Sequence, residues 1–557
     1  MRGDNLAEFL KKRYCILLPV FITALAVLTG FVRFIVNDDT AMMNIAESFN
    51  SNPYSEHLVF MSVIIGYVLK FLYSLISVIN WFVLIELFAL NLAFCALFYI
   101  NKHYGDSIFG VIALSGYLIF FLSNLTFTSV SLVCACTAML WLYVFADKLN
   151  KKTLKHFIFA FALFALASLI RVHGTMVVIG IVTALLLAVA VLKKQKSVAV
   201  LITAVVMILS VNYAVIYIQN EYNATIPTET YFTQFSKYRS AVSDGGFYDY
   251  GLHKEELDEK GISKNDFDLI SKWVYADKNA FSAEKFKAVS ELRTFNEKYN
   301  THIFSTALYI FKTSPLICIT ALLALFLFIK LKKKRLEIIL TFGAFFGAEG
   351  YLCSLYRDLS RICDALTLCA DIVILIIFIQ NRYEALKLKR IEPKRAKRIS
   401  LTICAVFIAL LSILNIWQAE YQPGYWNDIA EYTEENNGVT YIYDSFTMGD
   451  YYKTEYSKNI LRSKQGIITY RITLGGWTIY SPFWYNNLEK NGLSDYSDSL
   501  ISALLKDGVY YVDATVPPEN IVKFFDEHYG KKVEYEVIKT FEKQNDDVNI
   551  YNFYEVN

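Results

Sequence analysis

Two adjacent aspartates, Asp38 and Asp39, follow directly on the first long apolar stretch of the chain, Tyr14 to Val36. Within that stretch the only charged residue is Arg33. A carboxylate at the edge of a bilayer can meet both a lipid head group and a water-borne acceptor, and it can take the proton from a hydroxyl as that hydroxyl attacks. The pair is therefore the first candidate for a catalytic centre. The alternative interpretation is that two aspartates simply end a helix at the water boundary.

Two arginines four residues apart, Arg357 and Arg361, form the second candidate. On a helix this spacing places both on one face. Arginine binds phosphate through two parallel hydrogen bonds, and an arginine inside a membrane normally has a partner. We therefore predict that this pair faces a phosphate group near the outer interface. Ion pairs with Asp358 or Asp364, or snorkelling of the side chains to the interface, stay open as alternatives.

Two further groups are weaker candidates. Arg171 and His173 precede Gly174 at a predicted outer turn between two spans, where they could face a phosphate or belong to an ordinary tight turn. Glu56 and His57 lie in the same outer loop as the aspartates and could contribute acceptor or metal contacts. A divalent metal is possible there, although no cofactor is identified, and a plain surface histidine is the simpler interpretation of His57.

The composition is that of a membrane protein. Of the 557 residues, 55% are hydrophobic and 19% are charged, and the mean hydropathy is +0.35. Apolar runs of about 18 or more residues recur, and each is long enough to cross a bilayer core of about 30 Å. A net charge of +2 without a basic, aromatic surface stripe gives no indication of a nucleic acid partner. All nine cysteines lie in or beside apolar segments, which argues against a disulfide framework in the polar regions.

Basic clusters between the apolar runs predict the topology, because cytoplasmic loops carry an excess of lysine and arginine. With eleven spans, the clusters at 11–13, 148–152, 193–194, 332–335 and 387–398 all face the cytoplasm. The apolar stretch 58–78 would reverse this pattern if it crossed, so we expect it to lie along the outer leaflet. The predicted spans are 15–36, 81–100, 107–122, 126–146, 155–171, 174–192, 197–218, 304–329, 336–355, 362–380 and 400–417.

This map predicts two parts. Residues 1–417 form a polytopic α-helical membrane domain with outer loops at 37–80 and 219–303, and residues 418–557 form an extracytoplasmic α/β domain. The second outer loop is rich in aromatic residues and is expected to cover the cavity and shape acceptor binding. Its expected helices cover 263–276 and 283–299; in the C-terminal domain we expect strands at 439–443 and 509–512, a helix at 518–529 and a hairpin from 532–538 and 548–554.

The first outer segment, Val36-Asn37-Asp38-Asp39-Thr40 with Pro53 and Glu56-His57 after it, resembles the first outer loop of membrane-integral glycosyltransferases of the GT-C fold class. In build, the chain is similar to protein O-mannosyltransferases and aminoarabinose transferases. Those enzymes take a sugar from a polyprenyl-phosphate carrier. The resemblance implies an inverting transfer with Asp38 or Asp39 as general base, and similar enzymes carry an arginine motif near Arg357 and Arg361.

We therefore expect a multi-pass glycosyltransferase of the cell membrane, with a cytoplasmic N-terminus, that moves a sugar from a polyprenyl-phosphate donor to an extracytoplasmic acceptor. The acceptor is a cell-envelope glycan, a lipid or a protein. The expected partners are the donor, the acceptor and membrane lipids, without nucleic acid. Asp38 and Asp39 would be catalytic, and Arg357, Arg361 and Arg171 would bind the donor phosphate. A transporter or flippase of a lipid-linked saccharide, or a non-catalytic membrane scaffold, are the alternatives.

Overall fold

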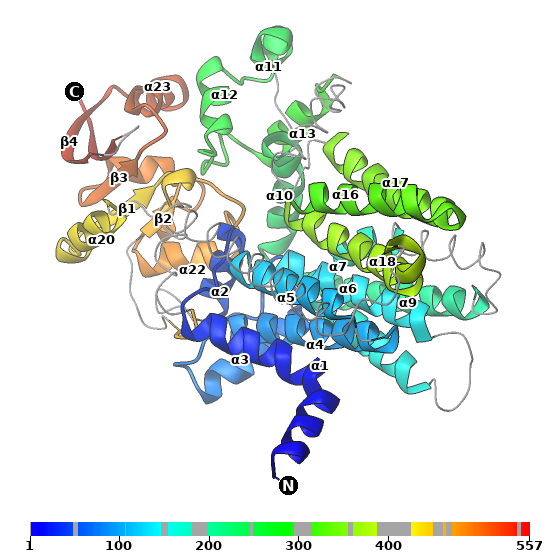
Figure 1. Cartoon of the computed structure of the whole chain (residues 1–557). Coiled ribbons are helices and arrows are strands. Elements are labelled where there is room, and N and C mark those ends of the chain that lie inside the picture. The colour runs from blue at the N-terminus through cyan, green and yellow to red at the C-terminus, as the bar shows by residue number, and fades with distance from the viewer. Residues whose placement is uncertain are drawn as a thin grey trace.

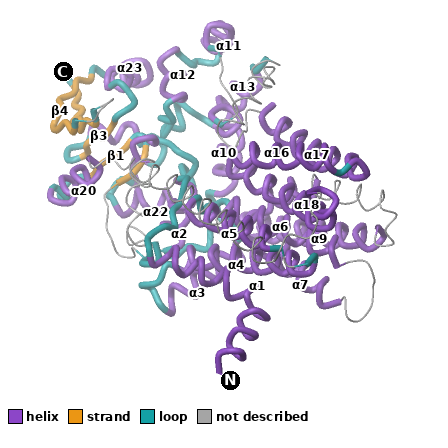
Figure 2. Tube along the Cα trace, in the orientation of Figure 1, coloured by secondary structure: helices purple, strands orange, loops and turns teal. Residues whose placement is uncertain are grey.

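The computed structural model describes residues 2–47, 54–105, 107–145, 154–180, 198–244, 249–294, 315–354, 360–386, 425–448, 460–463, 471–542 and 547–556. The described residues are mostly helical, and the strands among them lie in one small body near the C-terminus (Figures 1 and 2). The predicted span at 400–417, the basic run at 387–398 and the basic residues at 148–152 and 193–194 lie outside the described residues.

Four of the described helices contain a stretch that is long and apolar enough to cross a membrane. The four stretches are the whole of α4 (Trp81–His103), α6 (Phe127–Phe145) and α7 (Leu154–Val178), and residues Arg361–Asn381 of α18 (Ser360–Leu386). Those of the eleven predicted spans that do not correspond to these four stretches stay predictions. The remaining helices of this part are α1 (Arg2–Leu28), α5 (Ile108–Ser123), α9 (Val198–Asn223), α16 (Pro315–Lys330) and α17 (Arg335–Ser354).

The first helix ends at Leu28, earlier than the predicted end of the span at residue 36. Gly30 has φ of +69°, a left-handed conformation that glycine adopts without steric cost. The Phe31 and Gly30 N–H groups then donate to the carbonyls of Ala26 and Val27, which is the hydrogen-bond pattern of a Schellman cap. The apolar residues after Gly30 therefore do not extend this helix.

A helix break lies at the boundary predicted between the spans 155–171 and 174–192. Helix α7 extends from Leu154 to Val178, but it consists of two helical pieces that meet at Arg171, where φ is −156° and ψ is 94°. Residues 181–192 lie outside the described residues. The break at Arg171 is therefore present, and a reversal of the chain at this point stays a prediction.

Two short helices follow α1 in the first outer loop. Helix α2 (Asn37–Ala46) carries the aspartates, and α3 (Val63–Leu75) forms within the apolar stretch predicted to be interfacial. At about 1.5 Å per residue, the 13 residues of α3 are too short to cross a bilayer core. Its backbone meets the backbone of Glu56 closely at Gly66, where an added Cβ would lie 1.9 Å from the Glu56 carbonyl oxygen.

The second outer loop forms α10 (Glu229–Ser243), α11 (Lys254–Glu259), α12 (Lys264–Ser271) and α13 (Ala283–Glu291), joined by a 3-10 turn, η3 (Tyr250–His253). The C-terminal body is a five-stranded sheet in the order β2-β1-β3-β5-β4. Strands β1 (Thr440–Tyr443), β2 (Arg471–Thr473) and β3 (Val509–Asp513) are parallel, whereas β4 (Val533–Phe541) and β5 (Val548–Glu555) form an antiparallel hairpin. Helices α20 (Tyr425–Glu435), α22 (Pro482–Lys490) and α23 (Pro518–Tyr529) complete it.

The predicted strands at 439–443 and 509–512, the helix at 518–529 and the closing hairpin are all present, within a residue or a few at each end. The expected helix at 263–276 ends earlier, at Ser271, and the one at 283–299 is described as far as Glu291. Strand β2 and helices α20 and α22 were not predicted. Strand β2 is only three residues long, too short to show an alternation in the sequence.

The second outer loop and the C-terminal body share one hydrophobic core. Phe235, Tyr275 and Phe286 of the loop pack in the same cluster as Tyr480 and Tyr511 of the body. Figure 1 shows α10, α12 and α13 beside this body, above the apolar helices. Burying aromatic side chains of this size stabilises the contact substantially, because each removes a large apolar area from water. The two regions, about two hundred residues apart in the sequence, therefore fold against each other.

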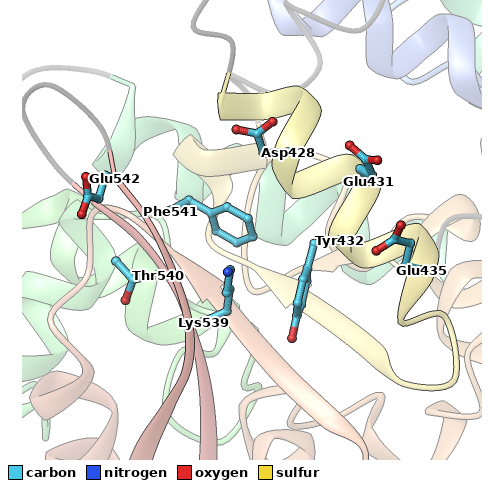
Figure 3. Close-up of a pocket in the computed structure, with 8 residues that line it drawn as sticks. All are labelled: Asp428, Glu431, Tyr432, Glu435, Lys539, Thr540, Phe541 and Glu542. Atoms are coloured by element: carbon cyan, nitrogen blue, oxygen red, sulfur yellow. The ribbon is translucent and has the colours of Figure 1, made fainter.

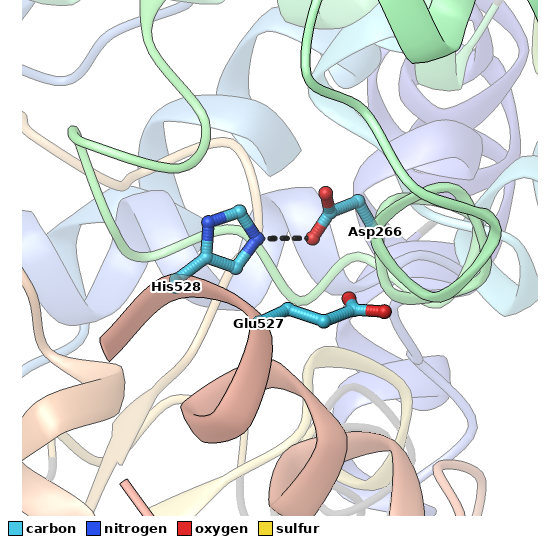
Figure 4. A group of neighbouring side chains, drawn as sticks. All are labelled: Asp266, Glu527 and His528. Atoms are coloured by element: carbon cyan, nitrogen blue, oxygen red, sulfur yellow. Dashed lines mark hydrogen bonds and ion pairs between the residues drawn. The ribbon is translucent and has the colours of Figure 1, made fainter. Parts of the chain in front are cut away.

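A polar cluster closes the edge of this shared core. His528 Nε2 lies 2.7 Å from Asp266 Oδ1 (Figure 4). The Ser263 hydroxyl donates to Glu527 at 2.8 Å. Asp266 is buried, and its second oxygen accepts the Ser263 N–H as part of a capping box at the start of α12. Among the described residues, Asp266, Glu527 and His528 are the only group of three histidine, cysteine or acidic side chains whose potential metal-ligand atoms all lie within 4.8 Å of one another. Their hydrogen bonds make them a contact between α12 and α23.

The C-terminal body also reaches the membrane helices directly. Residues 460–463 pair with the segment before α4, through Asn80 N–H to Leu461 O at 2.9 Å and Ser463 N–H to Val78 O at 3.0 Å. The Asn80 side chain, buried at the start of α4, donates to Ile460 O. These backbone bonds fix the body against the first outer loop.

The shared core predicts a large effect of a small substitution. Replacing Gly475 with alanine would place a Cβ 1.6 Å from the Trp273 carbonyl oxygen, so the backbone of one segment must move. We expect Gly475→Ala to destabilise the protein by about 1–3 kcal/mol, measured as a fall in melting temperature in detergent. Gly438→Ala is the control, because an added Cβ there meets nothing within 4 Å. Equal melting temperatures for both variants would contradict the close approach.

Candidate functional site

The candidate site lies where the first turn of α2 meets the starts of α6 and α18. Asp38 and Asp39 both belong to this first turn. The N-terminus of a helix carries partial positive charge, so carboxylates are favourable in this turn. They project in different directions, because successive residues of a helix are rotated by about 100°. The two aspartates, equivalent in the sequence, therefore have different environments.

Asp38 forms an ion pair with Arg361. Its Oδ2 lies 3.1 Å from Arg361 Nη1, and the two side chains are 17% and 13% exposed. The Arg361 Nε–H is buried and has no hydrogen-bond partner among the described residues. A second anion could therefore bind the same guanidinium, since arginine offers donors on two edges. The expected arginine is thus in contact with one of the two expected acids.

Asp39 is fully buried, with a relative exposure of 0%. Its Oδ1 accepts the backbone N–H of Phe127 at 2.6 Å, and Phe127 is the first residue of α6. Burial raises the pKa of Asp39 to about 8; the Phe127 hydrogen bond and the charges of Arg361 and Arg171 oppose this rise, whereas the charge of Asp38 adds to it. Asp39 is therefore placed to join α2 to α6 rather than to meet solvent.

Glu86 of α4 faces Asp39 within hydrogen-bond reach. Apart from this contact, the second oxygen of Asp39 and both oxygens of Glu86 are buried without a hydrogen-bond partner among the described residues. Two ionised carboxylates offer no donor to each other. The contact therefore requires at least one proton on the pair, because two like charges at this distance cannot both stay ionised in a buried site. Asp39 and Glu86 form a protonated pair of carboxyl groups.

Arg171 lies at the kink of α7, on the other side of Phe127. Its guanidinium carbon is 4.6 Å from the centre of the Phe127 ring and 5.3 Å from the centre of the Phe60 ring. The two rings are stacked on each other, with centroids 6.2 Å apart. Cation–π contacts of this kind hold a guanidinium in place. Arg171 also contributes positive charge at Asp39.

The other expected site residues lie elsewhere or are not described. Arg357 lies outside the described residues. Glu56 is paired with Lys70 at 2.7 Å. Burial raises the pKa of Glu56, but the hydrogen bond and charge of Lys70, together with hydrogen bonds from the Glu56 backbone and from Tyr222, hold the pKa below its usual value. The His57 Nε2 is 3.0 Å from Glu229 Oε2, with both side chains buried. His57 is therefore not a surface histidine, and it forms a contact between the first outer loop and α10.

Two groups at the site were not predicted from the sequence. Glu86 had a usable signal, since it is a single acid within the apolar run of α4, and ionisable residues inside membrane spans are costly and commonly functional. Phe127 had none, because its contribution is a backbone N–H that every residue except proline possesses. Only the approach of α2 to the start of α6 makes this N–H part of the site.

A pocket of about 300 Å³ lies directly beside α2. Helix α2 lines it with Asn37, Ala41 and Asn44, which share one face of the helix, and Asn37 precedes Asp38. The opposite wall comes from the C-terminal body and from Trp273 of the second outer loop. The pocket therefore lies where α2, the second outer loop and the C-terminal body meet, and Asn37 in its lining is the sequence neighbour of Asp38.

A second hollow, between α20 and β4, is lined by several acidic side chains (Figure 3). Carboxylates of Asp428, Glu431 and Glu435 project from α20 along one side, and Lys539 lies 5.9 Å from the centre of the Phe541 ring on the other. A rim with this many acids repels a phosphate group. This hollow is therefore not a candidate for the donor phosphate.

Comparison of the chain with family models, curated proteins and solved structures gives no match.

The protonated pair predicts how stability depends on pH. A carboxyl whose pKa is about 8 when folded and near 3.8 when unfolded stabilises the fold fully below pH 3.8 and loses this contribution as pH rises through 8. Asparagine at position 39 cannot ionise and can still accept the Phe127 N–H while donating to Glu86. Between pH 5 and pH 9, we therefore expect the melting temperature of Asp39→Asn in detergent to fall by several degrees less than that of the wild type.

The control is Asp495→Asn, since Asp495 is exposed in the C-terminal body. This variant should follow the wild-type pH profile. Parallel profiles for the wild type and Asp39→Asn would show that the pair of Asp39 and Glu86 is not protonated.

Proposed function

We propose that the chain is a membrane glycosyltransferase that moves a sugar from a polyprenyl-phosphate carrier to an extracytoplasmic acceptor, with Asp38 as general base. The observation that carries this proposal is the pair of Asp38 and Arg361 at the edge of the apolar helices, with Asp38 next in sequence to Asn37 of the pocket lining. An acid that can accept a proton and a guanidinium that can bind phosphate are the two groups that this transfer requires.

The environments of the two aspartates favour Asp38 as the base. Asp39 is buried, and its oxygens are engaged by the Phe127 N–H and by Glu86. A group in this position cannot take a proton from an incoming hydroxyl without breaking the contact that holds α2. Asp38 is partly exposed, and it pairs with the side chain of Arg361. Asp39 then acts as a positioning residue that fixes the turn from which Asp38 projects.

The ion pair also suggests how donor binding prepares the site. The carrier phosphate is a diester with one negative charge, and it can bind the two donor edges of arginine, so it competes with Asp38 for Arg361. Asp38 is then released to accept the proton of the acceptor hydroxyl. The acceptor oxygen forms its bond to the anomeric carbon as the bond from that carbon to the phosphate oxygen breaks. The phosphate keeps the electron pair, and Arg361 stabilises its added charge, together with Arg171.

Replacing the base should abolish turnover while sparing donor binding. We expect Asp38→Asn to lower the rate of polyprenyl-phosphate release by about 100-fold or more, because the acceptor proton then has no acceptor in place. The measurement uses purified protein in liposomes with a panel of polyprenyl-phosphate sugars and an acceptor extract. Binding of the labelled donor should stay within a few-fold of wild type. Asp495→Asn is the control for an acid remote from α2.

Replacing the arginine should act on the donor. We expect Arg361→Lys to raise the KM for the donor by about tenfold or more, because lysine keeps the charge but loses the two-edged contact with phosphate. Arg361→Ala should weaken both donor binding and turnover.

The alternative functions make different predictions in the same liposomes. Movement of the carrier across the bilayer, with no sugar release from any donor and no effect of Asp38→Asn, would establish a transporter instead. Unchanged behaviour of both the Asp38 and the Arg361 variants would leave a non-catalytic scaffold.

A further inference from the structure

The pocket beside α2 is built entirely from uncharged residues. None of the side chains that line it is acidic or basic, although 19% of the chain is charged. A charged ligand buried in such a pocket would lose its hydration without gaining a partner, which costs several kcal/mol. The lining therefore selects against anionic and cationic ligands, including the donor phosphate that Arg361 is proposed to bind.

Aromatic rings form much of the pocket wall. Trp273, Trp477 and Trp484 line it, together with Phe446 and Phe483. Three of the seven tryptophans in the sequence are thus gathered around one cavity of about 300 Å³. Flat aromatic faces stack on the C–H faces of sugar rings, and they offer large contact areas without needing a charged partner.

Short polar side chains lie among the rings. Asn37 and Asn44 line the side formed by α2, and Thr473, Thr478 and Asn487 line the side formed by the C-terminal body. Amide and hydroxyl groups can each donate and accept hydrogen bonds, so they match the hydroxyl groups of a carbohydrate. Groups of this kind suit a polar, uncharged ligand better than an acyl chain.

The pocket is joined to the candidate site by packed rings. Trp477 packs on Phe60 with ring centroids 4.5 Å apart, and Phe60 is stacked on Phe127. Phe127 supplies the N–H that holds Asp39. On the other side, Asn37 is the neighbour of Asp38 in α2. A ligand in the pocket therefore lies against the same helix turn that presents the proposed base.

From the neutral lining, the gathered tryptophans and the adjoining Asp38, we infer that this pocket binds an uncharged saccharide, and that this saccharide is the acceptor. The acceptor part of the inference rests on the proposed function. The volume of the pocket is at the lower end of the range for small-molecule sites. The pocket therefore holds a small part of a glycan rather than a long chain. The sugar stacks on the tryptophans, and one of its hydroxyls points toward Asp38.

Binding can be measured without turnover. The full-length protein in detergent is titrated with uncharged disaccharides (mannobiose, cellobiose and chitobiose), with digalacturonate as the charged probe and with a capped tri-alanine peptide. Isothermal titration calorimetry and saturation-transfer NMR report binding. We expect at least one uncharged disaccharide to bind and neither the charged disaccharide nor the peptide to do so.

Two variants test the pocket in different ways. Trp477→Ala removes a stacking surface, and Ala41→Phe fills the cavity from α2 without removing a contact. Each should weaken disaccharide binding at least tenfold, whereas Trp81→Phe, at the start of α4 and outside the pocket lining, should leave it unchanged. The melting temperature shows whether a variant has failed to fold. If one of the two pocket variants fails to fold, disaccharide binding by the other variant tests the pocket.

The two proposals fail separately. Binding of none of the uncharged disaccharides, binding that both pocket variants leave intact, or preferred binding of the peptide or the charged probe would each overturn the saccharide assignment. If Asp38-dependent release of polyprenyl phosphate is nevertheless observed, the transferase proposal stands. Disaccharide binding that depends on Trp477, without turnover from any donor, would support the saccharide site and overturn its role as acceptor site.

Discussion

The hydrogen bond from the Phe127 N–H to Asp39 is the contact on which the geometry of the candidate site depends. It joins the first turn of α2 to the first residue of α6, at the outer ends of the apolar helices. Burial favours the neutral form of Asp39, and protonation of its pair with Glu86 avoids two adjacent buried charges. Since helix geometry fixes the direction of neighbouring side chains, holding Asp39 inward also directs Asp38 to Arg361.

The outer parts of the chain form one assembly around this turn. The second outer loop and the C-terminal body share a hydrophobic core, and residues 460–463 join that body to the start of α4 by backbone hydrogen bonds. The uncharged pocket lies between α2 and this assembly. A charged site for the carrier phosphate and a neutral, aromatic site for an acceptor can thus lie side by side without competing, because their ligands differ in charge.

Much of the local structure could be predicted from patterns along the chain. Alternating hydrophobicity identified the hairpin of β4 and β5, and Pro517-Pro518 marked the start of α23. The division predicted in the apolar run 155–192 falls at the kink of α7, where the backbone of Arg171 leaves helical geometry. Strand β2 was missed because its three residues are too few to show an alternation, and its pairing with β1 is a tertiary contact.

The sequence by itself identified the long apolar helices typical of a membrane protein, the two adjacent acids after the first of them, and Arg361 at the end of another apolar stretch. These follow from composition and from the energetic cost of charge in a bilayer, which act on each segment separately. Only the tertiary structure decided that Asp39 is buried against Phe127 and Glu86 while Asp38 meets Arg361. Burial and pairing depend on segments up to about three hundred residues away, and no local pattern encodes those distances.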